Sequence, residues 1–220
     1  MIPKWAKHIL DLEEAKKITE AVKTVEASTI GEIVPMIVRR SSTIGHVFYS
    51  IVLAFFSLFL FLELIFYNQI LSLSYSYYWL TAGYIIVFPI AYLFSQFMWV
   101  QRFFVSEKDE YIQVMARAEL EFYRQKINGA NKRSGILLFV SLMEHKAVVL
   151  ADVSISQKLP NETWDKVVQT LVLGIKNNDA VSGFEKAISE CGAILKEKLP
   201  MSANAVKKSN ELSDLLIIKE

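Results

Sequence analysis

The sequence predicts an α/β fold, a small mixed sheet flanked by helices, that is interrupted by a transmembrane helical hairpin. Two runs, Val47 to Tyr67 and Tyr78 to Val100, are almost wholly apolar. Each is close to the roughly 20 residues that a helix needs to cross a bilayer. The chain on either side of them alternates amphipathic helical patterns with short apolar, β-branched runs, which is typical of a soluble α/β domain.

The two apolar runs are separated only by the link Asn68 to Tyr77, so we expect a hairpin. Arg39, Arg40 and Arg102 flank the runs, whereas the link contains no Lys or Arg. The positive-inside rule then predicts a multi-pass protein of the cell (inner) membrane, anchored in the lipid bilayer, with both termini in the cytoplasm. Glu63 is the charged residue within the runs; we expect a solvated interface position, with helix pairing or ion handling as the alternative.

Composition narrows the function classes. The chain is 53% hydrophobic and 21% charged, with a net charge of +1. That balance fits a membrane segment joined to a soluble domain and predicts no nucleic-acid partner. The one cysteine, Cys191, excludes an internal disulfide framework and any CxxC motif. The charged N-terminal stretch predicts no cleavable signal peptide.

The first part of the soluble domain should contain a helix and a strand. Asp11 and Glu14 have the spacing of a capping box, and apolar residues follow at helical spacing. Residues Glu32 to Val38 are rich in β-branched side chains and predict a strand. Because Pro35 has no N–H to donate, we expect it at an edge position or a bulge.

The part after the hairpin should contain a helix, a β-hairpin and two more helices. A helical pattern ends at Asn128-Gly129. Two strands, Gly135 to Ser141 and Lys146 to Asp152, should pair as a hairpin. Trp164 lies on the apolar stripe of the next helix, and Ser182 with Glu185 predicts the cap of the last one. The expected division of the chain is residues 1–45 and 101–200 for the domain, 46–100 for the hairpin and 201–220 for a C-terminal tail.

Several segments resemble the TPM domain in the same order. They are EASTIGEIVPMIVRRSS, RSGILLFVSLMEHKAVVLAD, a tryptophan-containing helix and AISECGAILKEKLP. The resemblance covers roughly residues 9 to 200 outside the hairpin, and it is strongest to a bacterial membrane subgroup with a two-span hairpin inside the domain. It implies the TPM fold. Acid phosphatase activity, divalent-cation binding and roles in assembly or repair have all been attributed to members of this family.

This chain departs from the family pattern at two positions. The family often has Asp, a variable residue and Gly after the second strand of the hairpin, where this chain has Asp152-Val153-Ser154. A position that is often Thr is Asn131. A glycine allows a tight loop to close around a cation, so its replacement bears directly on any metal site.

Glu32 and Asp152 are the candidate metal ligands. Glu32 begins the first predicted strand and Asp152 ends the third, so both are expected at one rim of the sheet. Carboxylate oxygens are the ligands that Ca²⁺ and Mg²⁺ prefer, but Ca²⁺ takes six to eight of them. Weak Ca²⁺ or Mg²⁺ binding is therefore one interpretation. The other is structural, with Glu32 capping or pairing locally and Asp152 beginning a turn.

Other reactive residue types give weaker signals. His8, His46 and His145 share no ligand spacing, and Cys191 falls on an apolar helical stripe, as a core residue does. Lys132 and Arg133 are candidates for phosphate or lipid contact, or for a solvated loop. No glycine-rich phosphate loop, Cys-x5-Arg or Asp-x-Asp motif is present.

The sequence leaves two classes of function. The favoured one is a membrane-anchored module on the cytoplasmic face that binds or helps to maintain another membrane protein. The alternative is a metal-assisted phosphatase or related hydrolase that uses the carboxylate rim.

Overall fold

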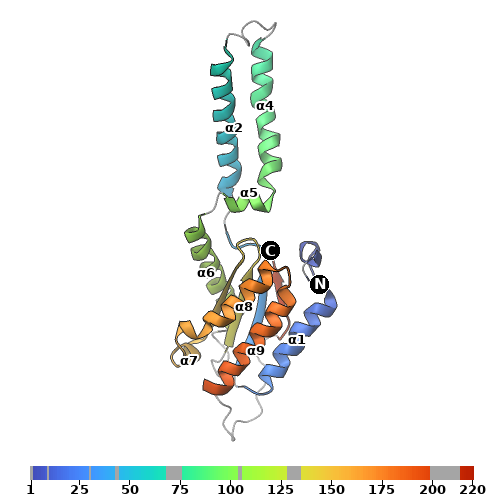
Figure 1. Ribbon diagram of the computed structural model, residues 1–220, viewed down its shortest axis with the longest axis vertical. Helices are drawn as coiled ribbons and strands as arrows, with labels where there is room; N and C mark the ends of the chain where they lie inside the picture. The colour runs from blue at the N-terminus through green and yellow to red at the C-terminus, as the bar shows by residue number, and fades with distance from the viewer. Residues whose placement is uncertain are drawn as a thin grey trace. The chain divides into compact units, whose positions relative to one another are not determined.

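The chain forms two compact units in a computed structural model, shown in Figure 1. The first unit combines residues 1–41 with 110–220, and the second comprises residues 42–109. The structure describes residues 2–8, 10–29, 31–42, 45–67, 76–103, 106–127, 135–198 and 214–220. Asn131, Lys132 and Arg133, which the sequence analysis discusses, and most of the predicted link (68–75) lie outside these residues.

A mixed four-stranded sheet is the centre of the first unit. Its strands are β1 (Glu32–Val38), β2 (Gly135–Ser141), β3 (Lys146–Ala151) and β4 (Ile217–Lys219), in the order β3-β2-β1-β4. β1 is parallel to β2 and to β4, whereas β2 and β3 form the expected antiparallel hairpin. The predicted small mixed sheet flanked by helices is confirmed, and β4 is an addition from the predicted tail.

Pro35 lies at an edge position, as predicted: β2 pairs with β1 along its whole length, but β4 pairs with it only from Met36 onward. The ladder explains how the strand accommodates it. The N–H of Arg39 donates to the carbonyl of Lys219 at 3.0 Å. Alternate residues of a parallel strand donate to the same side, so position 35 would also donate toward β4. β4 pairs with β1 only from Met36 onward, so the missing donor of Pro35 falls just before that pairing begins.

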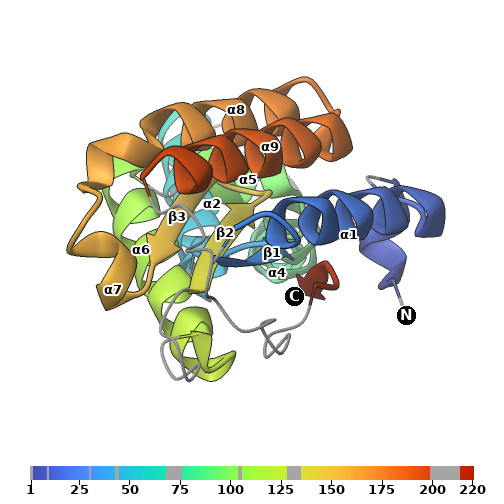
Figure 2. The same ribbon diagram turned by 90° about the horizontal axis from the view of Figure 1, so that it is seen from below.

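Helices cover both faces of the sheet (Figure 2). One face packs against α1 (Leu12–Glu26), α8 (Asp165–Lys176) and α9 (Ala180–Lys198), and the other against α6 (Glu107–Arg124). Three short helices complete the unit: η1 (Lys4–His8), α7 (Val153–Ser156) and η3 (Asn161–Trp164). Because both faces are covered, all seven residues of β1 and of β2 are buried.

The helix ends agree with the sequence at one site and differ at another. The capping box of α1 is present, with Asp11 and Glu14 each accepting the other's backbone N–H at 2.7 Å. The predicted cap at Ser182 is wrong, because α9 already begins at Ala180 and Asp179 accepts the N–H of Ser182. α8 and α9 approach closely at a pair of glycines: a Cβ placed on Gly174 would lie 2.7 Å from the Cα of Gly183.

The second unit contains α2 (Gly45–Ile65), α4 (Ser76–Ser95) and α5 (Met98–Phe103). α2 and α4 run side by side, and α5 lies across the N-terminal end of α2 and the C-terminal end of α4 (Figure 1). The expected run Tyr78 to Val100 is therefore not one helix, since the chain turns after Ser95. Among the described residues one helix, His46–Ile65, is long and apolar enough to cross a membrane, and Thr81–Ser95 is a shorter apolar stretch. A two-span hairpin is thus an expectation that the fold does not establish.

Candidate functional site: the acidic rim of the sheet

Glu32 and Asp152 lie in one row across the sheet, on either side of Gly135. Glu32 is the register partner of Gly135 in the parallel β1–β2 pair. The N–H of Asp152 donates to the carbonyl of Gly135 at 2.9 Å, which continues the β2–β3 register by one residue. Side chains in one row point to the same face, and the glycine between them carries none. The row brings both predicted residues to the same rim.

Both carboxyl groups are buried, with 3% of Glu32 and 2% of Asp152 exposed. Asp152 caps α7, where its Oδ1 accepts the backbone N–H of Val153. Its Oδ2 is buried and has no hydrogen-bond partner among the described residues. Buried polar atoms almost always have a partner, because an unmet one raises the free energy of the folded state. A cation or a water molecule at Oδ2 would supply that partner.

Glu26 and Asp214 extend the rim, and sequence reasoning missed both. Glu26 ends α1, and its Oε1 accepts the N–H of Ile33 at 2.7 Å. Burial raises the pKa of Glu26 to about 7 against the opposing hydrogen bond from Ile33, and the negative charges of Asp214 and Glu32 and a hydrogen bond with Asp214 add to the rise. Asp214 lies at the rim because β4 pairs with β1, and the short apolar run Leu215 to Ile218 does not by itself predict that pairing.

The rim offers little for a tightly bound metal ion. Among the described residues, no three His, Cys, Asp or Glu side chains are placed to hold a metal ion together. Glu32 and Asp152 alone supply fewer oxygens than the six to eight that Ca²⁺ takes. The geometry is compatible with a weakly held cation whose other ligands are water, or with a purely structural role for each carboxylate.

The remaining candidate residues are dispersed. His8 ends η1, His46 lies in the first turn of α2, and His145 lies in the β2–β3 turn with a positive φ of 50°. Cys191 is fully buried, and burial raises the pKa of its thiol, which makes the reactive thiolate scarce. Trp164 belongs to the core on the α1, α8 and α9 face.

A buried polar cluster ties the ends of β1 and β2 together. The Oγ atoms of Ser41 and Ser141 are 2.8 Å apart, and Ser141 also donates to Glu144. The backbone N–H of Ser41 donates to the other oxygen of Glu144 at 3.1 Å. These bonds fix the last residues of the α/β unit before the chain leaves it. Neither serine stood out in the sequence, because the bonds of Ser41 to Ser141 and Glu144 join residues that are far apart along the chain.

Within the second unit, Glu63 contacts the neighbouring helix. The hydroxyl of Tyr84 on α4 donates to Oε2 of Glu63 on α2 at 3.2 Å. The ring of Tyr84 also packs edge-on against Phe56 and Phe59. Of the roles considered for Glu63, helix pairing is the one that this contact favours.

Comparison with solved structures supports the fold. The NMR structure of the BA42 protein from the psychrophilic bacterium Bizionia argentinensis sp. nov. is similar, with a TM-score of 0.57 and 16% sequence identity. The similarity covers 95% of this chain and 94% of that one. No protein-family model and no curated protein matches the sequence. At this identity the likeness concerns the fold alone.

Proposed function

We propose that the protein is a membrane-anchored module with a TPM-type α/β domain at the cytoplasmic face of the cell membrane. In this proposal α2 and α4 are the two spans. Two spans return the chain to the side that it left, so both parts of the α/β unit share one compartment. The domain binds or helps to maintain another membrane protein.

The outward-facing apolar surface of α2 is the observation that carries this proposal. Only 11% of the window within His46–Ile65 is buried, and its mean hydropathy is 2.3. A surface of this kind would be an aggregation liability in water but is the normal exterior of a span. Large apolar side chains are exposed from Leu53 to the end of the helix: Leu53, Leu58, Leu60, Phe61, Leu62, Leu64 and Ile65.

The length of α4 supports a second span. Its 20 residues at about 1.5 Å each extend roughly 30 Å, the thickness of a hydrocarbon core. Pro89 lies inside this helix, and membrane helices tolerate proline when neighbouring groups satisfy the carbonyl that it frees. Ile85, Ile86 and Leu93 are exposed on its surface, as expected of a helix that contacts lipid.

A binding role is favoured over catalysis because, among the described residues, the acidic rim places no three carboxylate, His or Cys side chains to hold a metal ion together. Metal-assisted hydrolysis needs a metal with an open coordination position and groups that hold it there. The alternative function, a metal-assisted phosphatase or related hydrolase, is favoured by one observation, the orphaned Oδ2 of Asp152.

Two measurements on the full-length chain test the proposal. Alkaline carbonate extraction should leave the protein in the membrane pellet. Purification from native membranes in mild detergent, followed by mass spectrometry, should then recover the same membrane protein in independent preparations. Ile33→Asp is the control, because it unfolds the α/β unit without altering the apolar helices. It should stay in the pellet and lose the partner. Release by carbonate, or an unchanged partner on the control, contradicts the proposal.

A further inference from the structure

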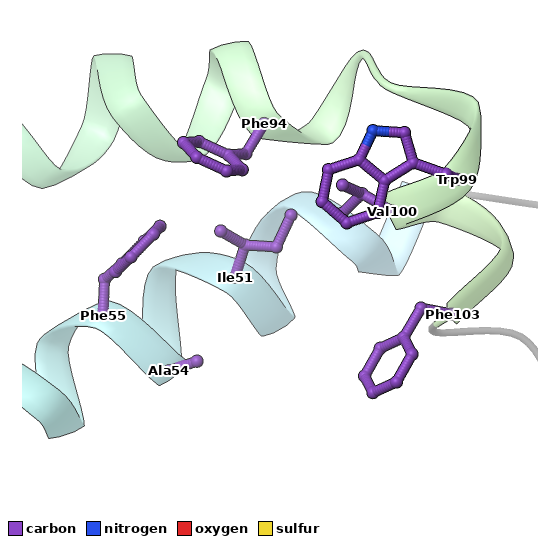
Figure 3. A pocket seen from close by; sticks show the side chains of 7 residues that line it. All are labelled: Ile51, Ala54, Phe55, Phe94, Trp99, Val100 and Phe103. Atoms are coloured by element: carbon purple, nitrogen blue, oxygen red, sulfur yellow. The ribbon is translucent and has the colours of Figure 1, made fainter.

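A pocket lined only by apolar residues lies where the N-terminal part of α2 and the C-terminal end of α4 meet α5 (Figure 3). It has a volume of about 210 Å³ and is open to the outside. α2 contributes three lining residues, α4 one and α5 three. They are Ile51, Ala54, Phe55, Phe94, Trp99, Val100 and Phe103.

α5 is fixed in place by specific contacts on its inner side. The side-chain amide of Gln101, which is 5% exposed, donates to the carbonyl of Ser95 at 2.7 Å and so satisfies a carbonyl at the end of α4. Val100 is buried in a cluster with Val47, Ile51 and Ala91. These contacts hold α5 against the ends of α2 and α4, so that α5 forms one wall of the pocket.

The outer side of α5 is strongly apolar. Phe103 is 83% exposed and Trp99 is 69% exposed. Trp is enriched where a span meets the head groups of a membrane, since its ring is apolar and its N–H is polar. Across the pocket from these rings the side chain of Ala54 is short, and this leaves the space between α2 and α5 open (Figure 3).

We propose that this pocket holds one acyl chain of an anionic phospholipid from the cytoplasmic leaflet. An apolar pocket of this kind offers nothing to hydrogen-bond a water or a polar ligand. Its walls are continuous with helices whose exposed surface is already apolar, so a bilayer chain reaches it without leaving hydrocarbon. The inference rests on the proposed membrane function, which supplies the bilayer.

The position of Arg102 favours an anionic head group. In residues 42–109, Arg102 and Lys108 are the only Lys or Arg residues, and Lys108 is flanked by Glu107 and Asp109, which leaves Arg102 as the basic residue next to the pocket in the sequence. Arg102 lies in α5, between the lining residues Val100 and Phe103. Basic residues next to a span attract anionic lipids on the cytoplasmic side. A lipid whose acyl chain occupies the pocket would thus have its head group next to the part of α5 that contains Arg102.

The test counts retained phospholipids by native mass spectrometry. The full-length protein is reconstituted into vesicles of phosphatidylethanolamine and phosphatidylglycerol and then extracted and washed in mild detergent. The wild-type chain should retain about one phosphatidylglycerol per chain. Ala54→Phe fills the pocket and should lower that retention at least fivefold. Ala82→Phe makes the same change on α4 at a residue that does not line the pocket, and it should retain the lipid.

Two further variants separate pocket loss from misfolding. Phe103→Ala removes an exposed wall without adding volume and should also lower retention. Arg102→Gln should leave a lipid bound but reduce the share of phosphatidylglycerol relative to phosphatidylethanolamine. Equal retention by Ala54→Phe and Ala82→Phe, or a free fatty acid in place of phospholipid, would overturn the lipid assignment. Carbonate extraction is measured in parallel: release of the wild-type chain defeats the membrane proposal, whereas a retained chain without bound lipid defeats only this inference.

Discussion

Lys219, in the last strand, places its ammonium group against the carboxylate of Glu121, a fully buried side chain on α6. Arg117 and Arg124 also approach this carboxylate, at 3.4 and 3.5 Å. Arg117 donates in addition to the backbone carbonyl of Glu220. The ion pairs therefore attach the short strand β4 to α6, and they compensate a charge that would otherwise be costly to bury.

Replacing Lys219 with Met should lower the free energy of unfolding by about 1–3 kcal/mol, because it removes the hydrogen-bonded partner of a buried charge. Thermal unfolding in detergent measures the change. The matched control is Lys16→Met: Lys16 pairs with Glu13 at 2.8 Å on the exposed surface of α1, and solvent screens such a pair, so its loss should change the stability far less. Equal losses in the two variants would show that Lys219 does not compensate Glu121.

Unfolding by acid should report the contribution of the same ion pair to stability. Burial alone would raise the pKa of Glu121, but the hydrogen bond from Lys219 and the charges of Lys219, Arg117 and Arg124 outweigh it and lower that pKa. A lowered pKa in the folded state contributes stability above the unfolded value that is lost as the pH falls through the folded value. The midpoint of acid unfolding should therefore move to higher pH in Lys219→Met and stay unchanged in Lys16→Met.

Glu26 should give a pH dependence of opposite sign. Its pKa rises from 4.5 to about 7 in the folded state, chiefly because it is buried. The folded protein then binds the proton more tightly, so the contribution is fully present below pH 4.5 and is lost as the pH rises to about 7. Glu26→Gln keeps an acceptor for the N–H of Ile33 and should flatten the stability curve between these pH values. Asp214→Asn should flatten it partly, and a curve that Glu26→Gln leaves unchanged would contradict the assignment.

The sequence was informative where local pattern and burial coincide. β1 and β2 were predicted to within a residue because both are covered on two faces and consist of nearly continuous apolar runs. β4 was missed because the apolar run Leu215 to Ile218 is too short to predict a strand by itself, and its pairing depends on a neighbour about 180 positions away. The break after Ser95 was missed because an apolar run gives no signal where the helix axis turns.

Of the residues at the acidic rim, the sequence likewise predicted some and missed others. Glu32 and Asp152 were placed at one rim by the order of the strands alone. Glu26 and Asp214 join it only through tertiary contacts, since one ends a helix and the other precedes β4. Whether Oδ2 of Asp152 has a hydrogen-bond partner depends on the residues packed around it in the fold, and no sequence pattern predicts that.

The two parts of the α/β unit should unfold together. Ile33 is 1% exposed and Ile37 is 2% exposed, in one core with residues of α8 and α9. Ile33→Asp or Ile37→Asp would bury an unpaired charge and should cost several kcal/mol. Limited proteolysis should then degrade residues 110–198 as readily as residues 10–38. Leu12→Asp, at a position that is 66% exposed, is the control and should leave the digestion pattern intact. Unchanged resistance after the Ile33 replacement would mean that the two parts fold independently.

Membrane topology gives a prediction that depends on the two-span proposal. A membrane-impermeant thiol reagent applied to whole cells should label a cysteine at Ser74 but not at Ser41 or Asn131, because Lys and Arg flank the spans on one side only. Cys191 is fully buried, so the native thiol should add little background. After the cells are opened, all three introduced cysteines should be labelled unless the fold protects them. Labelling at Ser41 from outside would reverse the orientation, and labelling at both Ser41 and Ser74 would exclude a hairpin.

Metal binding is the prediction that separates the two proposed functions. If Glu32 and Asp152 share a cation, the gain in stability follows RT ln(1 + [L]/Kd) with the free metal as the ligand. Because two carboxylates leave most of a Ca²⁺ shell to water, millimolar Ca²⁺ or Mg²⁺ should raise Tm only slightly. Asp152→Asn should abolish that rise, and Glu144→Gln serves as a control for altering a buried carboxylate elsewhere in the unit. The purified protein should show no phosphomonoester hydrolysis that depends on Glu32 or Asp152. Hydrolysis that is lost in Asp152→Asn while the fold persists would move the protein to the enzyme class and make this carboxylate a metal ligand or a base.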